Sequence, residues 1–352
     1  MRVLLLCTDS YGGHGGIALY NRDLAEALAS RPDCEEVTVI PRVVRTEPEA
    51  VPAKVRFMAR AARGPLSYLR ALFEARRRRP DLVICGHINL LPVAFLVSKD
   101  PLLLLYGIEA WKRPGSAISG RLLHRCRGIV AISRITRDRF LAWSGYAGRM
   151  FLLPNAIHPE RYGIRPPRQE LVARYGLKGK RVILTVGRLA HEERYKGFDE
   201  VLEVLPALPE DVVYVIAGGG SDQPRLEAKA AALGVRERVV FTGYFPEEEK
   251  ADLYSLADVF VMPSRGEGFG FVFLEALASG LPVIGSRIDG GRDALLDGEL
   301  GLLVDPANSA EIEAAIRELL ARRERHVPPR LEHFSFEHFT ARLAAIVDDV
   351  MR

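Results

Sequence analysis

Two glutamates flank a glycine-rich turn in the stretch "GEGFGFVFLEALASGLPVIGS". Gly268 and Gly270 carry no side chain, so backbone N–H groups there can approach a ligand closely. A helix that starts at Phe271 would favour an anion at its N-terminus. Glu267 would repel that anion and suits sugar hydroxyls, while Glu275, two helical turns on, suits a ribose hydroxyl pair. The spacing therefore indicates a sugar linked to a phosphate, although isolated glutamates are more often helix caps or surface residues.

Two cations follow the apolar run "RVILTVG": Arg188 directly, and Lys196 after a polar insert. Arginine supplies a planar fork of donors and lysine a compact charge, and both suit an anionic ligand. A solvated loop with ordinary surface charges explains the two residues equally well when they are considered alone. A further glycine turn with acids, "RIDGGRDALLDG", fits either a ligand loop or a helix N-terminus.

The first half of the chain contains a weak dinucleotide pattern. The stretch "TDSYGGHGGIALY" matches G-x-G-x-x-A at Gly13, Gly15 and Ala18. A nicotinamide site also needs an acid after the second apolar run, but "VTVI" continues into Pro41 and Arg42. A nicotinamide cofactor is therefore disfavoured, although an arginine can accommodate a 2′-phosphate.

Two further candidate residues end apolar runs in this half. His87 stands in "ICGHINL", and Tyr106 begins "YGIEAW". A histidine at this place can bond substrate or move a proton, and a structural histidine with satisfied hydrogen bonds is as common.

Short apolar runs alternate with helical patterns along the whole chain. The runs are "RVLLLCT", "VTVI", "DLVIC", "LLLLY", "GIVAIS", "FLLP", "RVILTVG", "VVYVIAGGG", "VVFTG", "VFVMPS", "PVIGS" and "GLLVDP". Continuous apolar runs between helices predict parallel strands that are buried on both faces. We therefore expect an α/β protein with two doubly wound Rossmann-like domains, residues 1–160 and 161–332, and a final helical segment, 333–352. Ligands of such sheets bind beyond the carboxyl ends of the strands, so the domains are expected to face each other across a cleft.

The composition bounds the class of protein. With 352 residues, 48% of them hydrophobic, the chain can build two cores. No apolar run approaches the length of a membrane span, and the N-terminal run lacks the cleavage pattern of a signal peptide. Four cysteines without a C-x-x-C pair are typical of reduced thiols in a cytoplasmic protein. No D-x-D, H-E-x-x-H or paired-cysteine motif occurs, so we expect no metal site.

These motifs together resemble those of the family 4 glycosyltransferases, retaining enzymes of the GT-B fold. The resemblance covers nearly the whole chain, and its most specific part is the E-x7-E element from Glu267 to Glu275. It is supported by "VGRL" with "KGF", by "GGG", by "FTGY" and by "LPNAIHPERY". The resemblance implies an N-terminal domain that binds the acceptor, a C-terminal domain that binds the nucleotide sugar, and a last helix that crosses back to the first domain.

The resemblance also implies roles for the matching positions. Arg188 and Lys196 would hold the donor diphosphate, where leaving-group charge develops. Glu267 would bond the hydroxyls of the donor sugar, and Glu275 would hold the ribose. The nucleoside diphosphate sugar is a substrate, so no separate cofactor is implied. Backbone would approach the donor at Gly15, Gly16, Tyr244, Phe245, Gly268, Phe269, Gly270 and Leu274.

The chain departs from the family pattern at Tyr106. Many relatives carry His-Gly-x-Asp/Glu where this chain has "YGIE", and the histidine is assigned to the donor sugar. A tyrosine can still form hydrogen bonds, but it is bulkier and uncharged at neutral pH. If Tyr106 takes over that contact, Tyr106→Phe should lower turnover strongly, and unchanged turnover would exclude the role.

Residues 53–80 form a basic segment with nine Lys or Arg and one Glu. Leu66, Leu69, Leu72 and Phe73 are expected on one helical face. The segment is either a solvated helix that covers the first sheet or a contact for anionic lipid headgroups. It lacks the interleaved aromatics of a nucleic-acid site, so no nucleic acid is expected.

The sequence therefore predicts a metal-independent retaining enzyme that moves a hexose from a UDP- or GDP-linked sugar to a glycan or lipid-linked acceptor. Cell-envelope polysaccharide or glycolipid synthesis at the inner face of the membrane is the expected setting. Two alternatives remain: a sugar-nucleotide epimerase on the same fold, which needs no acceptor, and a non-catalytic protein that binds nucleotide sugar without turnover.

Overall fold

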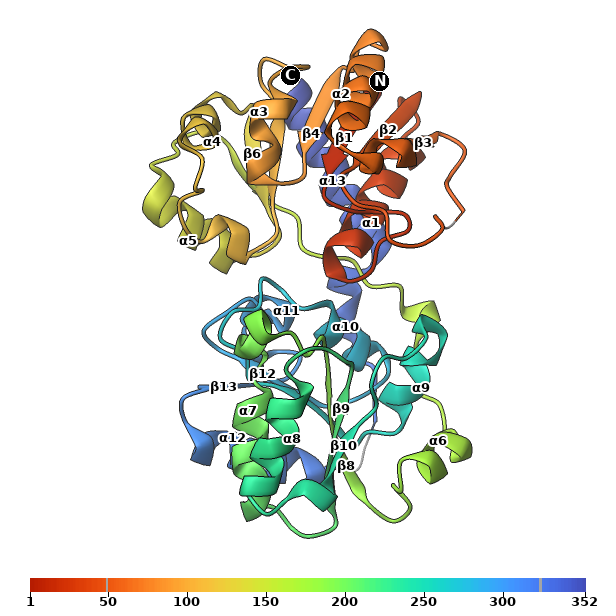
Figure 1. Cartoon of the computed structure of the whole chain (residues 1–352), viewed down its shortest axis with the longest axis vertical. Helices are drawn as coiled ribbons and strands as arrows, with labels where there is room; N and C mark the ends of the chain where they lie inside the picture. The colour runs from red at the N-terminus through yellow and green to blue at the C-terminus, as the bar shows by residue number, and fades with distance from the viewer. Residues whose placement is uncertain (49, 323–324) are drawn as a thin grey trace. The chain divides into compact units, whose positions relative to one another are not determined.

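The computed structural model describes residues 1–48, 50–322 and 325–352. The chain divides into two compact units, Met1–Ala156 with Phe336–Arg352, and Ile157–Ser335. Each unit contains one sheet in which every paired strand is parallel (Figure 1). The predicted α/β class with two doubly wound domains is confirmed. Each unit is described below by itself.

The sheet of the first unit has the order β3-β2-β1-β4-β5-β6-β7. Six of its strands are apolar runs recognised in the sequence; the edge strand β3, inside the basic segment, was not predicted. The strands are β1 Arg2–Cys7, β2 Glu36–Pro41, β3 Val55–Phe57, β4 Leu82–Cys85, β5 Leu102–Leu105, β6 Gly128–Ala131 and β7 Met150–Leu152.

Helices cover both faces of this sheet. They are α1 Gly16–Ser30, α2 Pro65–Arg77, α3 Leu91–Ala94, α4 Ala117–Leu122, α5 Arg134–Ser144 and α13 Phe336–Met351, with short 3-10 turns η1 Ala59–Arg63, η2 Ile88–Leu90, η3 Ile108–Ala110 and η4 Leu123–Arg125. α2 and α3 pack on the face that carries Leu4 and Val83. α13 runs along α1, where the rings of Tyr20 and Phe339 meet edge to face at 5.6 Å.

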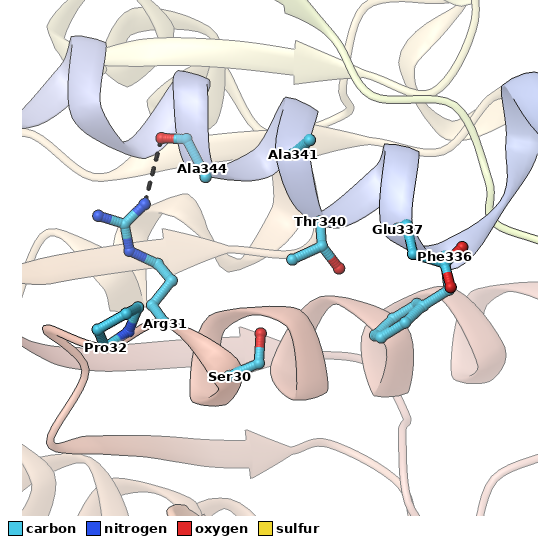
Figure 2. Close-up of a pocket in the computed structure, with 8 residues that line it drawn as sticks. All are labelled: Ser30, Arg31, Pro32, Phe336, Glu337, Thr340, Ala341 and Ala344. Carbon is cyan, nitrogen blue, oxygen red and sulfur yellow. Dashed lines mark hydrogen bonds between the residues drawn. The ribbon is translucent and has the colours of Figure 1, made fainter.

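The contact between α1 and α13 also contains a pocket of about 550 Å³ (Figure 2). Arg31 closes one end, because its Nη1 donates to the carbonyl oxygen of Ala344 at 3.3 Å and its Nη2 pairs with Asp348 at 2.7 Å. The pocket lies at the C-terminal end of α1. Since α1 starts at the carboxyl end of β1 and runs back along the sheet, the pocket lies away from the edge that carries the candidate residues.

The sheet of the second unit has the order β10-β9-β8-β11-β12-β13. All six strands were predicted from their apolar runs. They are β8 Arg181–Val186, β9 Val212–Ala217, β10 Val239–Phe241, β11 Val259–Met262, β12 Val283–Ser286 and β13 Leu302–Val304. The chain passes from β8 outward on both sides, so the carboxyl ends of β8 and β11, neighbours in the sheet, lie at one edge.

Helices again cover both faces. They are α6 Gln169–Arg174, α7 Phe198–Val204, α8 Gln223–Ala232, α9 Lys250–Ser255, α10 Phe271–Ala278, α11 Gly291–Ala294 and α12 Ser309–Ala321, with 3-10 turns η5 Pro159–Arg161, η6 His191–Lys196, η7 Leu205–Ala207, η8 Arg236–Arg238, η9 Glu247–Glu249, η10 Leu296–Gly298 and η11 Pro329–Phe334. α7, α8 and α12 share the core with Tyr214 and Ile216. α10 packs on β11, where Phe273 meets Phe260 at 5.8 Å.

Candidate functional site

Lys196 and Glu267 come together at the carboxyl edge of the second sheet. Lys196 ends η6 after β8, and its Nζ donates to Glu267 Oε2 at 3.2 Å. Glu193 Oε2 lies 3.7 Å from the same nitrogen. Burial lowers the pKa of Lys196, but the charges of Glu267 and Glu193 outweigh it, so the pKa is held above its usual value. Lys196 is therefore a fixed cation with only 15% of its side chain exposed.

Arg188 lies beside this pair but remains at the surface. It follows β8 by two residues, pairs with Glu193, and keeps 71% of its side chain exposed. Glu193 thus bridges the two cations that the sequence singled out. An anion that binds here would meet one preset cation, Lys196, and one exposed cation, Arg188.

Glycines let the loops of this edge approach one another closely. A Cβ on Gly218 would lie 2.0 Å from the carbonyl oxygen of Gly187, and one on Gly220 would lie 2.3 Å from that of Leu189. The "GGG" segment therefore packs its backbone directly on "VGRL", the segment that carries Arg188. The two motifs therefore share a close backbone contact that a side chain at Gly218 or Gly220 would prevent.

The loop between β11 and α10 places Glu267 at the edge of the sheet. We call residues 263–270 the Glu267 loop. Gly270 caps α10 with a φ of 92°, a conformation that favours glycine, and α10 starts at Phe271 as predicted. Phe269 is 1% exposed and packs edge to face on Phe334 at 5.5 Å, and Leu274 is 0% exposed. The side chains of Phe269 and Leu274 are thus core, so any donor contact there would come from backbone.

Glu275 is buried and already has partners. Only 1% of the residue is exposed, and its Oε1 accepts from Lys250 Nζ at 2.7 Å. Its Oε2 accepts from the Tyr254 hydroxyl at 2.8 Å. The alternative that Glu275 is a surface carboxylate is therefore wrong. Its predicted contact with a ribose stays a prediction, and it would use the lone pairs that Lys250 and Tyr254 leave open.

Tyr244 and Phe245 follow β10 at the same edge. Tyr244 is 82% exposed, and its ring lies against Gly219, where a Cβ would come within 2.9 Å of a ring carbon. Phe245 is half-buried. The exposed tyrosine ring is thus a flat surface above the "GGG" segment, next to the β9 end.

Tyr106, in the first unit, points into the interior. Its hydroxyl donates to Asn21 Oδ1 at 2.6 Å, and Asn21 Nδ2 donates to the carbonyl oxygen of Asp9 at 2.9 Å. Burial raises the pKa of Tyr106 well above its usual value. Glu109 accepts from the backbone N–H of Tyr106 at 2.5 Å. Tyr106 is thus held by hydrogen bonds at its backbone and at its hydroxyl.

Replacing Tyr106 by phenylalanine will destabilise the first unit by about 1–3 kcal/mol, because the buried Oδ1 of Asn21 loses its donor. Thermal unfolding of the variant measures this. Tyr195→Phe, in the second unit, is the control and should change stability less. Equal stability of Tyr106→Phe and the parent protein would show that the hydrogen bond from Tyr106 to Asn21 does not stabilise the first unit.

His87 lies at the end of β4, next to Tyr106. A Cβ on the preceding Gly86 would lie 2.9 Å from the Tyr106 hydroxyl, which shows how closely the two strand ends meet. His87 Nδ1 accepts from the backbone N–H of Asn89 at 3.0 Å, and burial lowers the pKa of the imidazole. At neutral pH the ring is therefore neutral with its proton on Nε2. It is set up to donate a hydrogen bond rather than to take a proton.

Gly15 and Gly16 form the exposed start of α1. Gly15 is the N-cap with a φ of 91°, and a Cβ there would meet no atom within 4 Å. The backbone is open to a ligand at this point. Gly15 and Gly16 belong to the first unit together with Tyr106 and His87, whereas the acids and cations of the E-x7-E region belong to the second.

Four residues of the site were not singled out from the sequence. Glu193, Lys250 and Tyr254 were overlooked because they stand in helical stretches with no distinctive spacing. Asp289 lies in the glycine turn "RIDGGRDALLDG", which was noted without assigning the residue. In the described parts of the chain, no group of three His, Cys, Asp or Glu is arranged to hold a metal ion.

Sequence families match both halves of the chain. The pattern "Glycosyltransferase Family 4" matches residues 14–161, and "Glycosyl transferases group 1" matches residues 167–330. The GDP-mannose-dependent alpha-(1-6)-phosphatidylinositol monomannoside mannosyltransferase of Mycolicibacterium smegmatis is 36% identical over 204 residues, 55% of this chain and 53% of that enzyme. The matched region thus spans about half the length of that relative. The phosphatidyl-myo-inositol mannosyltransferase of Mycobacterium leprae is 27% identical over 93% of this chain and 90% of its own.

Solved structures share the fold over the whole chain. The Anabaena protein HepE in complex with UDP and glucose has a TM-score of 0.76 at 19% identity and covers 99% of this chain and 100% of its own. The lipopolysaccharide outer core galactosyltransferase WaaB, in its apo form, has a TM-score of 0.73 at 18% identity, with 99% of each chain covered. These likenesses confirm the expected GT-B fold. With two family patterns that together span both halves, the chain belongs to family 4 of the glycosyltransferases.

Proposed function

We propose that the protein is a retaining glycosyltransferase that moves a hexose from a nucleoside diphosphate sugar to a lipid-linked acceptor. The observation that carries this proposal is the Lys196–Glu267 pair, 3.2 Å apart, beside the glycine-capped start of α10. A cation next to a carboxylate suits a ligand that joins a phosphate to a hydroxyl-rich sugar. GDP-mannose is the first donor to test, because the relatives described above are named for mannosyl transfer.

Lys196 and Arg188 perform the electrostatic part of the reaction. When the bond between the sugar and the diphosphate breaks, negative charge develops on the departing phosphate oxygen. A preset cation and a helix N-terminus directed at that oxygen stabilise the transition state more than the ground state. The two cations take the place that a metal ion holds in other transferases, so we propose that the reaction needs none.

Glu267 positions the donor sugar by accepting from its hydroxyls. The departing phosphate oxygen takes the acceptor proton on the same face of the sugar, which retains the anomeric configuration without an enzyme nucleophile. Transfer of mannose from GDP-mannose to a phosphatidylinositol-type acceptor, followed by product analysis, tests the proposal. Donor conversion without acceptor would instead identify an epimerase, and nucleotide binding without any turnover would identify a binding protein.

The surface of α2 supports a lipid-linked acceptor. Leu66, Leu69 and Phe73 are exposed at 72%, 37% and 47%, whereas Leu72 is buried, which corrects its placement on the same face. Basic residues are also exposed on and beside this helix, among them Arg63, Arg70, Arg76 and Arg77. An amphipathic helix with arginines beside exposed apolar side chains is typical of helices that lie on anionic membranes. No helix in the described residues is long and apolar enough to span a membrane.

We expect the protein to float with anionic vesicles and to remain behind with neutral ones. Each arginine near an anionic surface contributes about 1 kcal/mol, so replacing Arg70, Arg76 and Arg77 by glutamine should weaken partitioning by about 100-fold. Replacing Lys178 and Lys180, exposed in the second unit, by glutamine is the control and should have little effect. Equal recovery of the parent protein with both kinds of vesicle would count against membrane binding.

A further inference from the structure

Asp289 holds the backbone of Glu267 from the neighbouring strand end. Its Oδ2 accepts from the Glu267 N–H at 2.8 Å and from the Ser264 hydroxyl at 2.7 Å. Its Oδ1 accepts from the N–H of Gly291 at 3.0 Å, at the start of α11. One carboxylate therefore ties together the two loops that follow β11 and β12.

Gly290, the residue next to Asp289, also binds the backbone of Glu267. The N–H of Gly290 donates to the carbonyl oxygen of Glu267 at 2.8 Å, so both backbone groups of Glu267 are held. A Cβ on Gly290 would lie 2.2 Å from the carbonyl oxygen of Gly268. The contact is thus too close for any residue but glycine, and the backbones of the two loops pack directly on each other.

A buried ionised carboxylate costs free energy unless hydrogen bonds or opposite charges compensate for the water that it loses. Asp289 is 1% exposed, and burial raises its pKa to about 7, although its three hydrogen bonds oppose that rise. An amide at this place has a single acceptor oxygen, so it cannot accept from both Glu267 and Gly291. The carboxylate is the group that fits the observed set of donors.

We propose that Asp289 is the positioning residue for Glu267: it fixes the Glu267 loop, and through it the carboxylate beside Lys196, in the geometry that turnover requires. This inference rests on the proposed function. Asp289 does not itself contact Lys196 among the hydrogen bonds of the described residues; it acts through the backbone of Glu267. Protonation of Asp289 would weaken this hold, because a neutral carboxyl is a poorer acceptor than a carboxylate.

The pH dependence follows from the groups that surround Asp289. The charged residues nearby are Glu267 on the facing loop, Lys196 beyond it in η6, and Arg292, Asp293 and Asp297 on its own side. Glu267 acts directly and adds to the rise in the pKa of Asp289. Since that pKa rises from 3.8 to about 7 on folding, the folded protein keeps a proton that the unfolded chain releases. This carboxyl therefore makes folding less favourable as pH rises between the two values, while the ionised form supports turnover.

Asp289→Asn tests the proposal. We expect kcat to fall by about 10–100-fold, because a small displacement of a substrate-positioning group has effects of this size, with a much smaller change in the donor KM. The parent enzyme should lose kcat as pH falls below about 7, and the variant should lack this acid limb. Ser264→Ala, which removes one donor to the same carboxylate, should lower kcat less. Asp258→Asn is the matched control, because Asp258 accepts the backbone N–H of Val182 at 2.7 Å at the opposite end of β8.

Hydrogen exchange separates this inference from the proposed function. In Asp289→Asn the amides of residues 264–270 should exchange faster, with no such change in Asp258→Asn. Hydrogen exchange can be measured even if the parent protein turns over no donor. Faster exchange in the variant without any turnover would reject the proposed function and still support the contact between Asp289 and the Glu267 loop. Unchanged exchange in the Glu267 loop, or an acid limb that persists in the variant, would overturn the inference.

Discussion

Lys196→Met will lower turnover of the nucleotide sugar by about 10²–10³-fold, the loss seen when one preset donor to a developing oxyanion is removed. Methionine keeps an unbranched side chain that is one heavy atom shorter, and it removes the ammonium charge together with its hydrogen-bond donors. Glu267 and Glu193 then lose the cation at 3.2 and 3.7 Å, and their own charges repel the departing phosphate. The loss should appear mainly in kcat, because the charge develops in the transition state.

Steady-state turnover with saturating donor measures this effect. Lys180→Met is the matched control, since Lys180 is exposed at the amino end of β8, away from the candidate residues, and its loss should change kcat less than twofold, the scale of a surface substitution. Arg188→Gln should have an intermediate effect because its side chain is 71% exposed and its charge is partly screened. A Lys196→Met enzyme that turns over as fast as the control would show that the cation has no part in the reaction.

Glu275→Gln will destabilise the second unit by about 3 kcal/mol, the lower end of the range for a buried ion pair that loses one partner. Lys250 would remain with 12% of its side chain exposed and without the carboxylate at 2.7 Å. Burial lowers the pKa of Lys250, but the charges of Glu275 and Glu247 outweigh it and hold the pKa above its usual value. Glu247 is 72% exposed at its side chain and can compensate only in part.

The double variant Glu275→Gln with Lys250→Met separates the pair from its surroundings. Removing both charges should recover much of the lost stability, because no unpaired charge is left in the interior. Urea unfolding measures the stability of Glu275→Gln, of Lys250→Met and of the double variant. The control Glu313→Gln, which breaks an exposed pair with Arg317, should lower stability by less than about 1 kcal/mol. A Glu275→Gln variant no less stable than Glu313→Gln would contradict a buried, coupled pair.

This pair also changes the design of binding experiments. Glu275 was predicted to hold the ribose, so its replacement is an obvious way to weaken nucleotide binding. Because Glu275 also pairs with Lys250 and Tyr254, a loss of binding would be mixed with a loss of stability. Lys196→Met is a better variant for weakening nucleotide binding. Its side chain lies at the candidate phosphate site and is not part of the Glu275 pair.

The fold could be predicted from the sequence because the physical signal is strong. Twelve apolar runs, each too short for a helix and each followed by polar or glycine residues, became twelve strands in two parallel sheets. The edge strand β3 was not predicted because its three residues, "VRF", lie in a basic stretch and carry no periodic pattern. Leu72 was placed on one helical face with Leu66, although it follows Tyr68 by four residues and packs with it in the core.

The site was predictable where a residue type and a glycine turn coincide along the chain. Glu267 beside Gly268 is such a case, and the partner Lys196 followed from its strand end. Contacts between distant segments left no such trace. Lys250 meets Glu275 across 25 positions, and Asp289 meets Glu267 across 22, so only the fold brings them together. The burial that gives both contacts their effect is a property of the packed structure and not of the local sequence.

Thermal unfolding with GDP, UDP and ADP and their sugar conjugates is the most direct test of the donor site. A nucleotide at about 100 times its dissociation constant stabilises its unit by about 2.7 kcal/mol. The expected result is a rise in melting temperature of about 5–11 °C with one nucleotide, reduced in Lys196→Met and kept in Lys180→Met. The base that gives the shift identifies the donor, and GDP is expected. No shift with any nucleotide, or a full shift in Lys196→Met, would contradict a donor site built on Lys196 and Glu267.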